Sequence, residues 1–187
     1  MSPRVVQGTA HFYGGFSATA TGTVTRYHGT IADAAENIMR GAHGEDDHGA
    51  FLATIALCGT ACEVAAAYAF RRFLEADAAA LKHRLHESAK AAVRELLKST
   101  ATVNLAHKTQ HALWFAMTGD NLPRSWGDWS KYKPFVQLRN RVVHSGRIDN
   151  ARARPQPSDA ERAVHITRSL HAHIKVVLQN AGLGAYA

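Results

Sequence analysis

With 187 residues, the chain is long enough to bury a core without a disulfide bond or a structural metal, and we expect one compact domain with an appended arm. Its two cysteines exclude a disulfide-rich scaffold, and the spacing of Cys58 and Cys62 within an apolar run predicts two small buried side chains on one helix face. The first residues carry no apolar stretch behind a basic start, so we expect no signal peptide and a cytoplasmic protein. The net charge is +7, and its distribution along the chain is considered below with the basic residues.

The N-terminal part has the pattern of two short strands. Hydroxyl side chains alternate with small or apolar ones from Ser17 to Thr25, and this period of two predicts a strand. The pair Gly14-Gly15 separates it from Gln7 to Tyr13, which predicts a β-hairpin. Since a weakly hydrophobic hairpin is marginally stable alone, we expect it to lie on the body of the protein or on a second subunit.

Two helices are predicted next, one short and one long. Thr30 is a candidate N-cap and Gly41 is placed to end the first helix, so residues 1–45 are interpreted as an arm and a short helix. A long apolar segment extends from about Gly49 to Glu75. Its most membrane-like stretch, Gly49 to Phe70, is mostly Ala, Gly and Thr and carries Glu63 near its centre. We interpret it as the buried central helix of a bundle and expect no membrane partner.

Three further segments are predicted before residue 134. Asp77 is placed to cap a helix that has an apolar stripe, whose residues are given at the end of this paragraph. Another helix, from Val103 to Met117, is expected to end before Gly119. The segment from Asp120 to Lys133 has the Pro, Gly and Trp content of a loop. The stripe of the first of these helices comprises Leu81, Leu85, Ala89, Ala92, Val93 and Leu96.

The last two helices complete a mainly α fold. Pro134 suits the first turn of a helix that should stop near Gly146, and the capping box from Ser158 to Glu161 opens the final helix. The sequence therefore predicts a helical domain over residues 46–187, a bundle of about five helices preceded by a short β-hairpin-like arm.

The basic residues concentrate in one segment. Between Asn121 and Arg154 there are eight Lys and Arg side chains against only two Asp, which predicts a surface for a polyanion such as RNA. On charge alone, a solvated basic face that keeps the protein soluble explains the segment equally well. The candidate RNA contacts are Arg124, Lys131, Lys133, Arg141 and Arg147.

The most informative segment is Leu138–Gly146, which reads Leu-Arg-Asn-Arg-Val-Val-His-Ser-Gly. An Arg followed five residues later by a His is weak evidence alone, because a chain with 12 His and many Arg produces such a spacing by chance. Arg168 and His173 repeat the spacing inside the last amphipathic helix without an Asn after the Arg, and we interpret them as that chance case. Arg139 differs because Asn140 follows it.

These residue types suit the cleavage of RNA by its own 2′-hydroxyl. The reaction needs a base for the hydroxyl proton, an acid for the leaving 5′-oxygen and a cation for the charge that develops on the phosphate. Histidine side chains in general titrate near neutral pH, which suits His144 to proton transfer, and the Arg139 guanidinium matches phosphate oxygens without losing its charge. Asn140 is one turn before His144, so its amide is placed to orient the imidazole.

The whole segment resembles the R-N-x-x-x-H motif of the HEPN superfamily, and the resemblance covers roughly residues 50–180. It implies a helical bundle that dimerises so that the motifs of two protomers face each other, and that cleaves RNA without a metal or another cofactor. Arg139, Asn140 and His144 match the motif's arginine, its polar helper and its catalytic histidine.

The spacing within the motif leaves two arrangements open. Five residues turn a helix by about 140°, so Arg139 and His144 of one straight helix cannot easily share a phosphate. Either the helix loosens toward Gly146, or the two side chains that share a phosphate come from different chains. In a purely structural alternative, Arg139 forms an ion pair, for which Glu63 is the obvious partner, and His144 is a histidine favoured by the helix dipole.

Other histidines and aromatic residues allow simpler interpretations. His107 and His111 have the spacing of two zinc ligands, but no third ligand is apparent, and we expect no metal site. Trp126, Trp129 and Tyr132 alternate with basic residues and suit stacking on RNA bases, yet anchoring of a long loop to the core is the favoured interpretation.

Three functions are compatible with these features. The leading hypothesis is a homodimeric, metal-independent endoribonuclease that cleaves single-stranded RNA as a toxin or antiviral effector, controlled by an antitoxin or another regulatory protein. The alternative is a non-catalytic HEPN domain that binds RNA or a partner protein through the same surface. A DNA-binding regulator is the third, although no helix-turn-helix pattern is evident.

Overall fold

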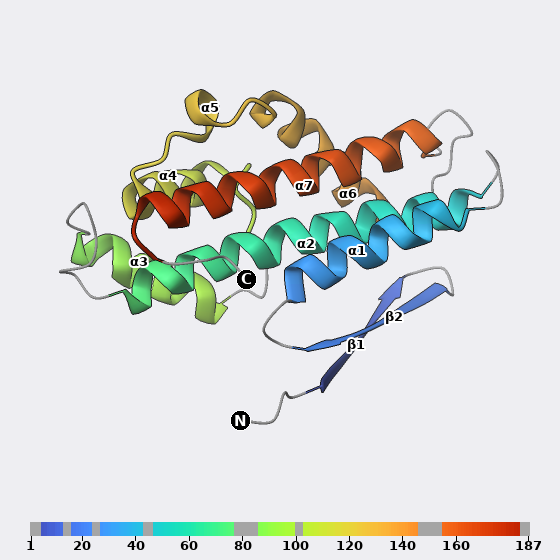
Figure 1. Cartoon of the computed structure of the whole chain (residues 1–187), viewed down its shortest axis with the longest axis horizontal. Helices are drawn as coiled ribbons and strands as arrows, with labels where there is room; N and C mark the ends of the chain where they lie inside the picture. The colour runs from blue at the N-terminus through green and yellow to red at the C-terminus, as the bar shows by residue number, and fades with distance from the viewer. Residues whose placement is uncertain are drawn as a thin grey trace. The chain divides into compact units, whose positions relative to one another are not determined.

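The computed structural model describes residues 5–12, 16–23, 27–42, 47–76, 86–99, 103–145 and 155–183, with side chains from residue 31 to residue 143 and over 155–183 within these ranges. The fold is mainly helical, as predicted (Figure 1). The elements in chain order are β1 (Val5–Phe12), β2 (Phe16–Thr23), α1 (Tyr27–Arg40), α2 (His48–Glu75), α3 (Glu87–Ser99), α4 (Lys108–Thr118), α5 (Leu122–Ser125), α6 (Trp129–Ser145) and α7 (Pro157–Asn180).

The chain divides into two compact units. Unit 1 comprises Met1–Ala61 with Lys133–Arg168, and unit 2 comprises Cys62–Tyr132 with Ser169–Ala187. The helices α2, α6 and α7 each contribute residues to both units. The expected boundary near residue 45 between an arm and a helical domain stays a prediction.

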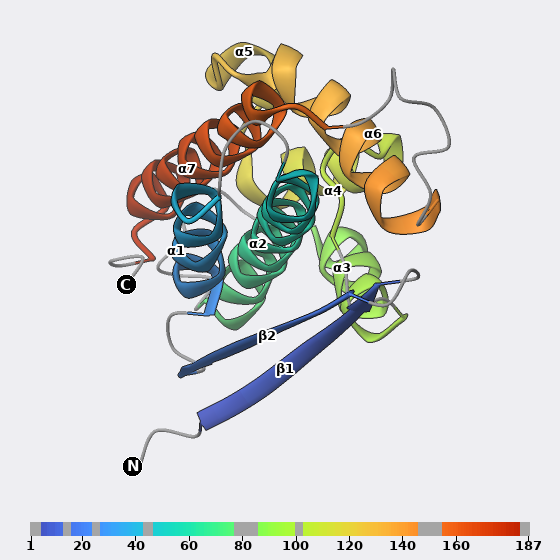
Figure 2. The same ribbon diagram turned by 90° about the vertical axis from the view of Figure 1, so that its right-hand side faces the viewer.

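Unit 1 contains the two strands, which pair antiparallel with Val5 opposite Thr23 and Phe12 opposite Phe16. Within the same unit, α1 runs antiparallel beside the first part of α2, as Figures 1 and 2 both show. The hydroxyl of Thr54 on α2 donates a hydrogen bond of 3.3 Å to the carbonyl oxygen of Ala35 on α1, and both residues are buried. This bond satisfies a polar side chain in the interface of the two helices.

A second helix of unit 1, α7, is bonded to α2 through Thr167. Its hydroxyl lies 3.3 Å from the carbonyl oxygen of Cys58 and 2.9 Å from that of Ala163. Cys58 is completely buried, and burial raises the pKa of its thiol to about 12, so the thiol stays protonated at neutral pH. Both cysteines are buried and neither forms a disulfide bond, which confirms the interpretation of Cys58 and Cys62 as small core residues.

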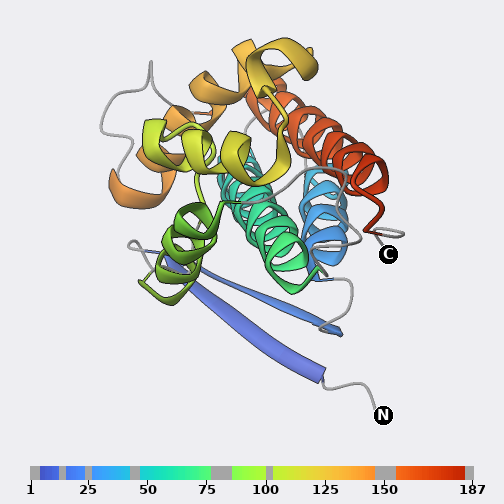
Figure 3. The same ribbon diagram turned by 90° about the vertical axis from the view of Figure 1, so that its left-hand side faces the viewer.

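Unit 2 has an aromatic core. Phe70 on α2 and Trp114 on α4 meet edge to face with ring centroids 5.8 Å apart. Helices α3 and α4 contact each other in this unit (Figure 3). The guanidinium of Arg72 donates a hydrogen bond of 2.6 Å to the carbonyl oxygen of Leu183, which ties the end of the described chain to α2. The largest buried side chains here are Phe70, Phe73, Leu105, Trp114, Met117, Leu122, Tyr132, Leu170, Ile174 and Leu178.

Helix α2 confirms the predicted long apolar helix, since it runs from His48 to Glu75 over 28 residues. By length and composition it is able to cross a membrane, but 72% of its most apolar stretch is buried inside the protein. This degree of burial is typical of the core helix of a bundle.

The starts of α1 and α4 differ from the prediction. Helix α1 begins at Tyr27, so Thr30 lies inside it and is not its N-cap, whereas the predicted end before Gly41 is confirmed. Helix α4 begins at Lys108 instead of Val103, because the side chain of Asn104 bends the chain first: its amide oxygen accepts a hydrogen bond of 2.9 Å from the backbone N–H of Ala106.

The predicted helix after Asp77 is seen in its second half, as α3. Ala89 and Val93 are buried as expected, whereas Ala92 is exposed, so the apolar face is narrower than the predicted stripe. Asp77, Leu81 and Leu85 lie outside the described residues.

The segment before Pro134 contains more helix than predicted. The short helix α5 lies within the expected loop, and α6 begins at Trp129. The backbone N–H groups of Lys131 and Tyr132 bond to the carbonyl oxygen of Asp128, which forms the first turn of α6. Pro134 therefore lies in the second turn, where it removes one hydrogen bond of the helix without ending it. Helix α6 is described as far as Ser145, and Gly146, near which the helix is predicted to stop, lies outside the described residues.

The capping residues of α7 are shifted from the predicted box of Ser158 and Glu161. Pro157 is the first helical residue, and the carboxylate of Asp159 accepts a hydrogen bond of 3.0 Å from the backbone N–H of Gln156. Gln156 and Asp159 therefore hold the capping positions, because Pro157 is well suited to the first position of a helix.

The C-terminus of α4 gives a stability prediction. Gly119 has φ 71°, in the left-handed region, and its N–H bonds to the carbonyl oxygen of Phe115 at 2.8 Å. We expect Gly119→Ala to lower the free energy of unfolding by about 1 kcal/mol, because a Cβ is disfavoured at this φ. Gly127→Ala is the control, since φ is not positive there and an added Cβ would meet nothing within 4 Å. Urea denaturation of the two variants checks the difference, and equal stabilities would contradict it.

Candidate functional site

The motif residues lie on α6, and the structure describes the side chains of the first two. Arg139 and Asn140 are partly buried on the helix, and its backbone continues through His144, whose side chain lies outside the described part. Because α6 remains an α-helix up to Ser145, the five residues from Arg139 to His144 turn through about 140°. Loosening of the helix is therefore not seen as far as Ser145, and Gly146 lies outside the described residues.

Arg139 extends across the backbone of α2 within unit 1. It passes so close to Gly59 that a Cβ added to this glycine would lie 2.4 Å from the Cγ and 2.9 Å from the Nε of the arginine. The Nε atom is buried. The aliphatic part of the side chain is thus packed on a neighbouring helix, and the guanidinium is held at a defined place.

The guanidinium also binds its neighbour in the motif. Nη1 of Arg139 donates a hydrogen bond of 3.1 Å to Oδ1 of Asn140. The oxygen of the Asn140 amide is thereby engaged by the arginine, while its NH₂ group is the part of the amide suited to a histidine nitrogen acceptor. The expected contact between Asn140 and His144 stays a prediction, because the imidazole lies outside the described side chains.

Glu63, the expected partner of Arg139, is buried, with 9% of its surface exposed. It belongs to unit 2, whereas Arg139 belongs to unit 1. The ion pair between them stays a prediction.

The candidate RNA contacts lie on α5 and α6. Arg124, Lys131, Lys133 and Arg141 are exposed, and Arg147 lies outside the described residues. The ammonium of Lys131 is 2.7 Å from the carboxylate of Asp128, so part of its charge is neutralised locally. The role of these side chains in RNA binding stays a prediction.

The second Arg and His at the motif spacing, Arg168 and His173, each bind an acidic side chain of the protein, and their interpretation as a chance spacing stays a prediction. Arg168 bonds to Glu36 and, at 2.8 Å, to Asp33, both on α1 in unit 1. The hydrogen bond from Arg168 holds the pKa of Glu36 below its usual value. His173 instead lies 2.9 Å from the carboxylate of Asp120 in unit 2.

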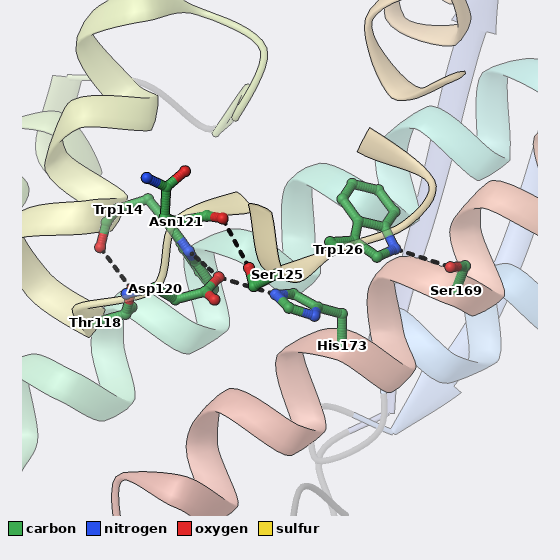
Figure 4. A network of polar contacts seen from close by, with 8 residues as sticks. All are labelled: Trp114, Thr118, Asp120, Asn121, Ser125, Trp126, Ser169 and His173. Atoms are coloured by element: carbon green, nitrogen blue, oxygen red, sulfur yellow. Dashed lines mark hydrogen bonds and ion pairs between the residues drawn. The ribbon is translucent and has the colours of Figure 1, made fainter. Parts of the chain in front are cut away.

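His173 and Asp120 belong to a polar network that no pattern in the sequence predicts (Figure 4). The Asp120 carboxylate accepts a hydrogen bond of 2.9 Å from the indole N–H of Trp114, and the imidazole of His173 stacks on Trp126 with centroids 6.0 Å apart. The indole N–H of Trp126 donates to Ser169 at 2.8 Å. The network fixes the segment around α5 to α7 within unit 2.

The aromatic residues of this segment anchor it, as favoured from the sequence. Trp126 and Tyr132 are 5% and 1% exposed, so neither offers a face to RNA bases. Trp129 is partly exposed and packs against the ring of His111 at 4.8 Å. Within the described ranges, no cluster of three or more His, Cys, Asp and Glu side chains is placed to hold a metal ion.

Comparison with protein-family models, with curated protein sequences and with solved structures finds no match to this chain. The functional assignment therefore depends on the residues of the chain themselves, and above all on the segment from Leu138 to Gly146.

The network makes stability depend on pH. Burial raises the pKa of the Asp120 carboxyl, but the hydrogen bonds from His173, Ser125 and Trp114 and the attraction of His173 outweigh burial, so the pKa lies below its usual value. A carboxyl whose pKa is lowered by folding stabilises the protein above its unfolded pKa of about 4, and this contribution is lost as the pH falls through the folded value.

We expect Asp120→Asn to reduce the free energy of unfolding at pH 7 by about 2 kcal/mol and to weaken its decline between about pH 5 and pH 3. Chemical denaturation over this pH range is the measurement. Glu161→Gln, at an exposed position of α7, is the matched control and should leave the pH profile unchanged. A parallel profile for Asp120→Asn and the unmodified protein would overturn the role assigned to this carboxylate.

Proposed function

We propose that this protein is a metal-independent endoribonuclease of the HEPN type, with Arg139, Asn140 and His144 as its catalytic residues. The observation that supports it is the Arg139–Asn140 pair, held together by a hydrogen bond of 3.1 Å, one helical turn before His144 on the same helix. The exposed basic side chains of α5 and α6 supply the charge that an RNA backbone requires.

In the proposed reaction, the 2′-hydroxyl of a nucleotide attacks the adjacent phosphate. His144 accepts the hydroxyl proton, and the bond to the 5′-oxygen breaks as a protonated group donates a proton to that oxygen. The Arg139 guanidinium stabilises the negative charge that develops on the phosphate. The products are a 2′,3′-cyclic phosphate and a 5′-hydroxyl, without oxidation or reduction.

The proposed active form is a homodimer with a composite site. On one helix that remains regular through Ser145, Arg139 and His144 are about 140° apart, which favours their meeting at a phosphate from two different chains. We propose single-stranded RNA as the substrate, a cytoplasmic location, a role as a toxin or antiviral effector, and an antitoxin or regulatory protein as the controlling partner.

A second candidate is a non-catalytic HEPN domain that binds RNA or a partner protein. The packing of Arg139 on Gly59 favours it, because an arginine held by its own chain has a structural task besides any catalytic one. This candidate implies salt-sensitive RNA binding without the formation of cleavage products.

We expect His144→Ala to lower the rate of RNA cleavage by about 100- to 10,000-fold, because the reaction loses its general base. The measurement is the appearance of fragments with 2′,3′-cyclic phosphate ends from a labelled single-stranded RNA, in buffer with EDTA. Full activity of the variant, or cleavage only on addition of Mg²⁺, would contradict the proposal.

His107→Ala is the matched control for this experiment. His107 is exposed and lies before α4, so its replacement removes an imidazole from the surface without touching the motif. Cleavage by this variant should equal that of the unmodified protein. RNA binding without cleavage by the unmodified protein would support the non-catalytic candidate instead.

A mixing experiment tests the composite site. We expect Arg139→Ala and His144→Ala each to be inactive alone, and an equimolar mixture, after exchange of subunits, to recover roughly a quarter of the original activity. Half of the dimers are then mixed, and each mixed dimer has one intact site. Co-purification of the untagged variant with an affinity-tagged copy of the other confirms the exchange, and a mixture that stays inactive after exchange would place both side chains in one chain.

A further inference from the structure

Gly59 occupies an unusual position for a glycine. It lies in the interior of the 28-residue helix α2 and is buried, where glycine is a poor helix former because it has no side chain to pack and gains conformational freedom on unfolding. A glycine kept at such a place needs a reason in the surrounding structure.

The reason is the side chain of Arg139, which lies in the same unit. A Cβ on residue 59 would come within 2.4 Å of its Cγ, 2.9 Å of its Nε and 3.0 Å of its Cδ. These atoms are in the middle of the side chain, so they cannot move away without moving the guanidinium. The Nε is buried, and Nη1 is bonded to Asn140, so the arginine is held along its length.

We propose that Gly59 is a positioning residue for Arg139. Because residue 59 has no Cβ, the side chain of the arginine occupies the space beside the backbone of α2, and this sets the guanidinium beside Asn140. The part of this inference that concerns catalysis rests on the proposed ribonuclease function. The part that concerns the position of the side chain does not, because it depends only on the packing of α2 and α6 in unit 1.

The position is tested by a double-mutant cycle with urea denaturation. In the unmodified protein, we expect Gly59→Ala to lower the folding equilibrium constant by about tenfold, because the new methyl group overlaps the arginine. In the Arg139→Ala background, the same change should raise that constant by about fivefold, because alanine favours the helix and the three atoms nearest to the new methyl group are gone. A change of the same sign in both backgrounds would overturn the inference.

Gly49→Ala is the matched control on the same helix. Its Cβ would lie no nearer than 3.8 Å to another atom, the carboxylate oxygen of Asp47. This substitution should have the same effect on stability with and without Arg139, which separates the contact at Gly59 from the general preference of a helix for alanine.

The catalytic part is tested with the same variants on single-stranded RNA. We expect Gly59→Ala to lower kcat by about as much as Arg139→Ala while KM stays within about twofold, and the double variant to be no less active than Arg139→Ala alone. Independent, multiplicative losses in the double variant would overturn the catalytic part. If the unmodified protein leaves RNA intact, the proposed function fails and this part fails with it, whereas the stability cycle still decides the position of the arginine.

Discussion

A short segment of α2, from Thr54 to Gly59, organises the helices of unit 1. The Thr54 hydroxyl bonds to the backbone of α1, the Cys58 carbonyl accepts a bond from α7, and Gly59 receives the side chain of Arg139 from α6. Each contact depends on a small residue, because a larger side chain would separate the backbones or displace the neighbouring helix. The small residues of α2 thus provide more than burial, since they allow hydrogen bonds with α1 and α7 and close packing of an α6 side chain against the same helix.

The charges of the described residues fall into two groups. Arg168 is engaged by the acids of α1, and Asp120 is engaged by His173, so these charges are used to hold the fold. Arg124 and Lys133 are exposed on α5 and α6, and their role as RNA contacts stays a prediction. Arg139 differs from both groups. The middle of its side chain is packed against Gly59, and its guanidinium donates a hydrogen bond to Asn140.

The sequence predicted what depends on strong local patterns and missed what depends on side-chain contacts. The long apolar run identified α2, and Gly119 ended α4 as expected. The start of α4 was misplaced because Asn104 forms a turn through its own side chain. The capping of α7 was misplaced by two residues because the side chain of Asp159 accepts a hydrogen bond from the backbone N–H of Gln156.

The candidate site shows the same division between local and distant effects. The order of Arg139, Asn140 and His144 along one helix is visible in the sequence. The contact with Gly59 is not, because the two residues are far apart in the chain and no periodicity links them. The network around Asp120 is not visible in the sequence either, because Asp120 and its partner His173 are far apart in the chain.

The contact of Arg139 with Gly59 also has a consequence for how such sequences change over evolutionary time. The arginine requires a glycine at this position of α2, so the two positions should covary in homologous chains. Where the arginine is lost, selection no longer opposes a side chain at the glycine position, and alanine or serine should accumulate there. A glycine in the middle of an apolar helix then marks the chains that retain the arginine, even where the rest of the motif has diverged.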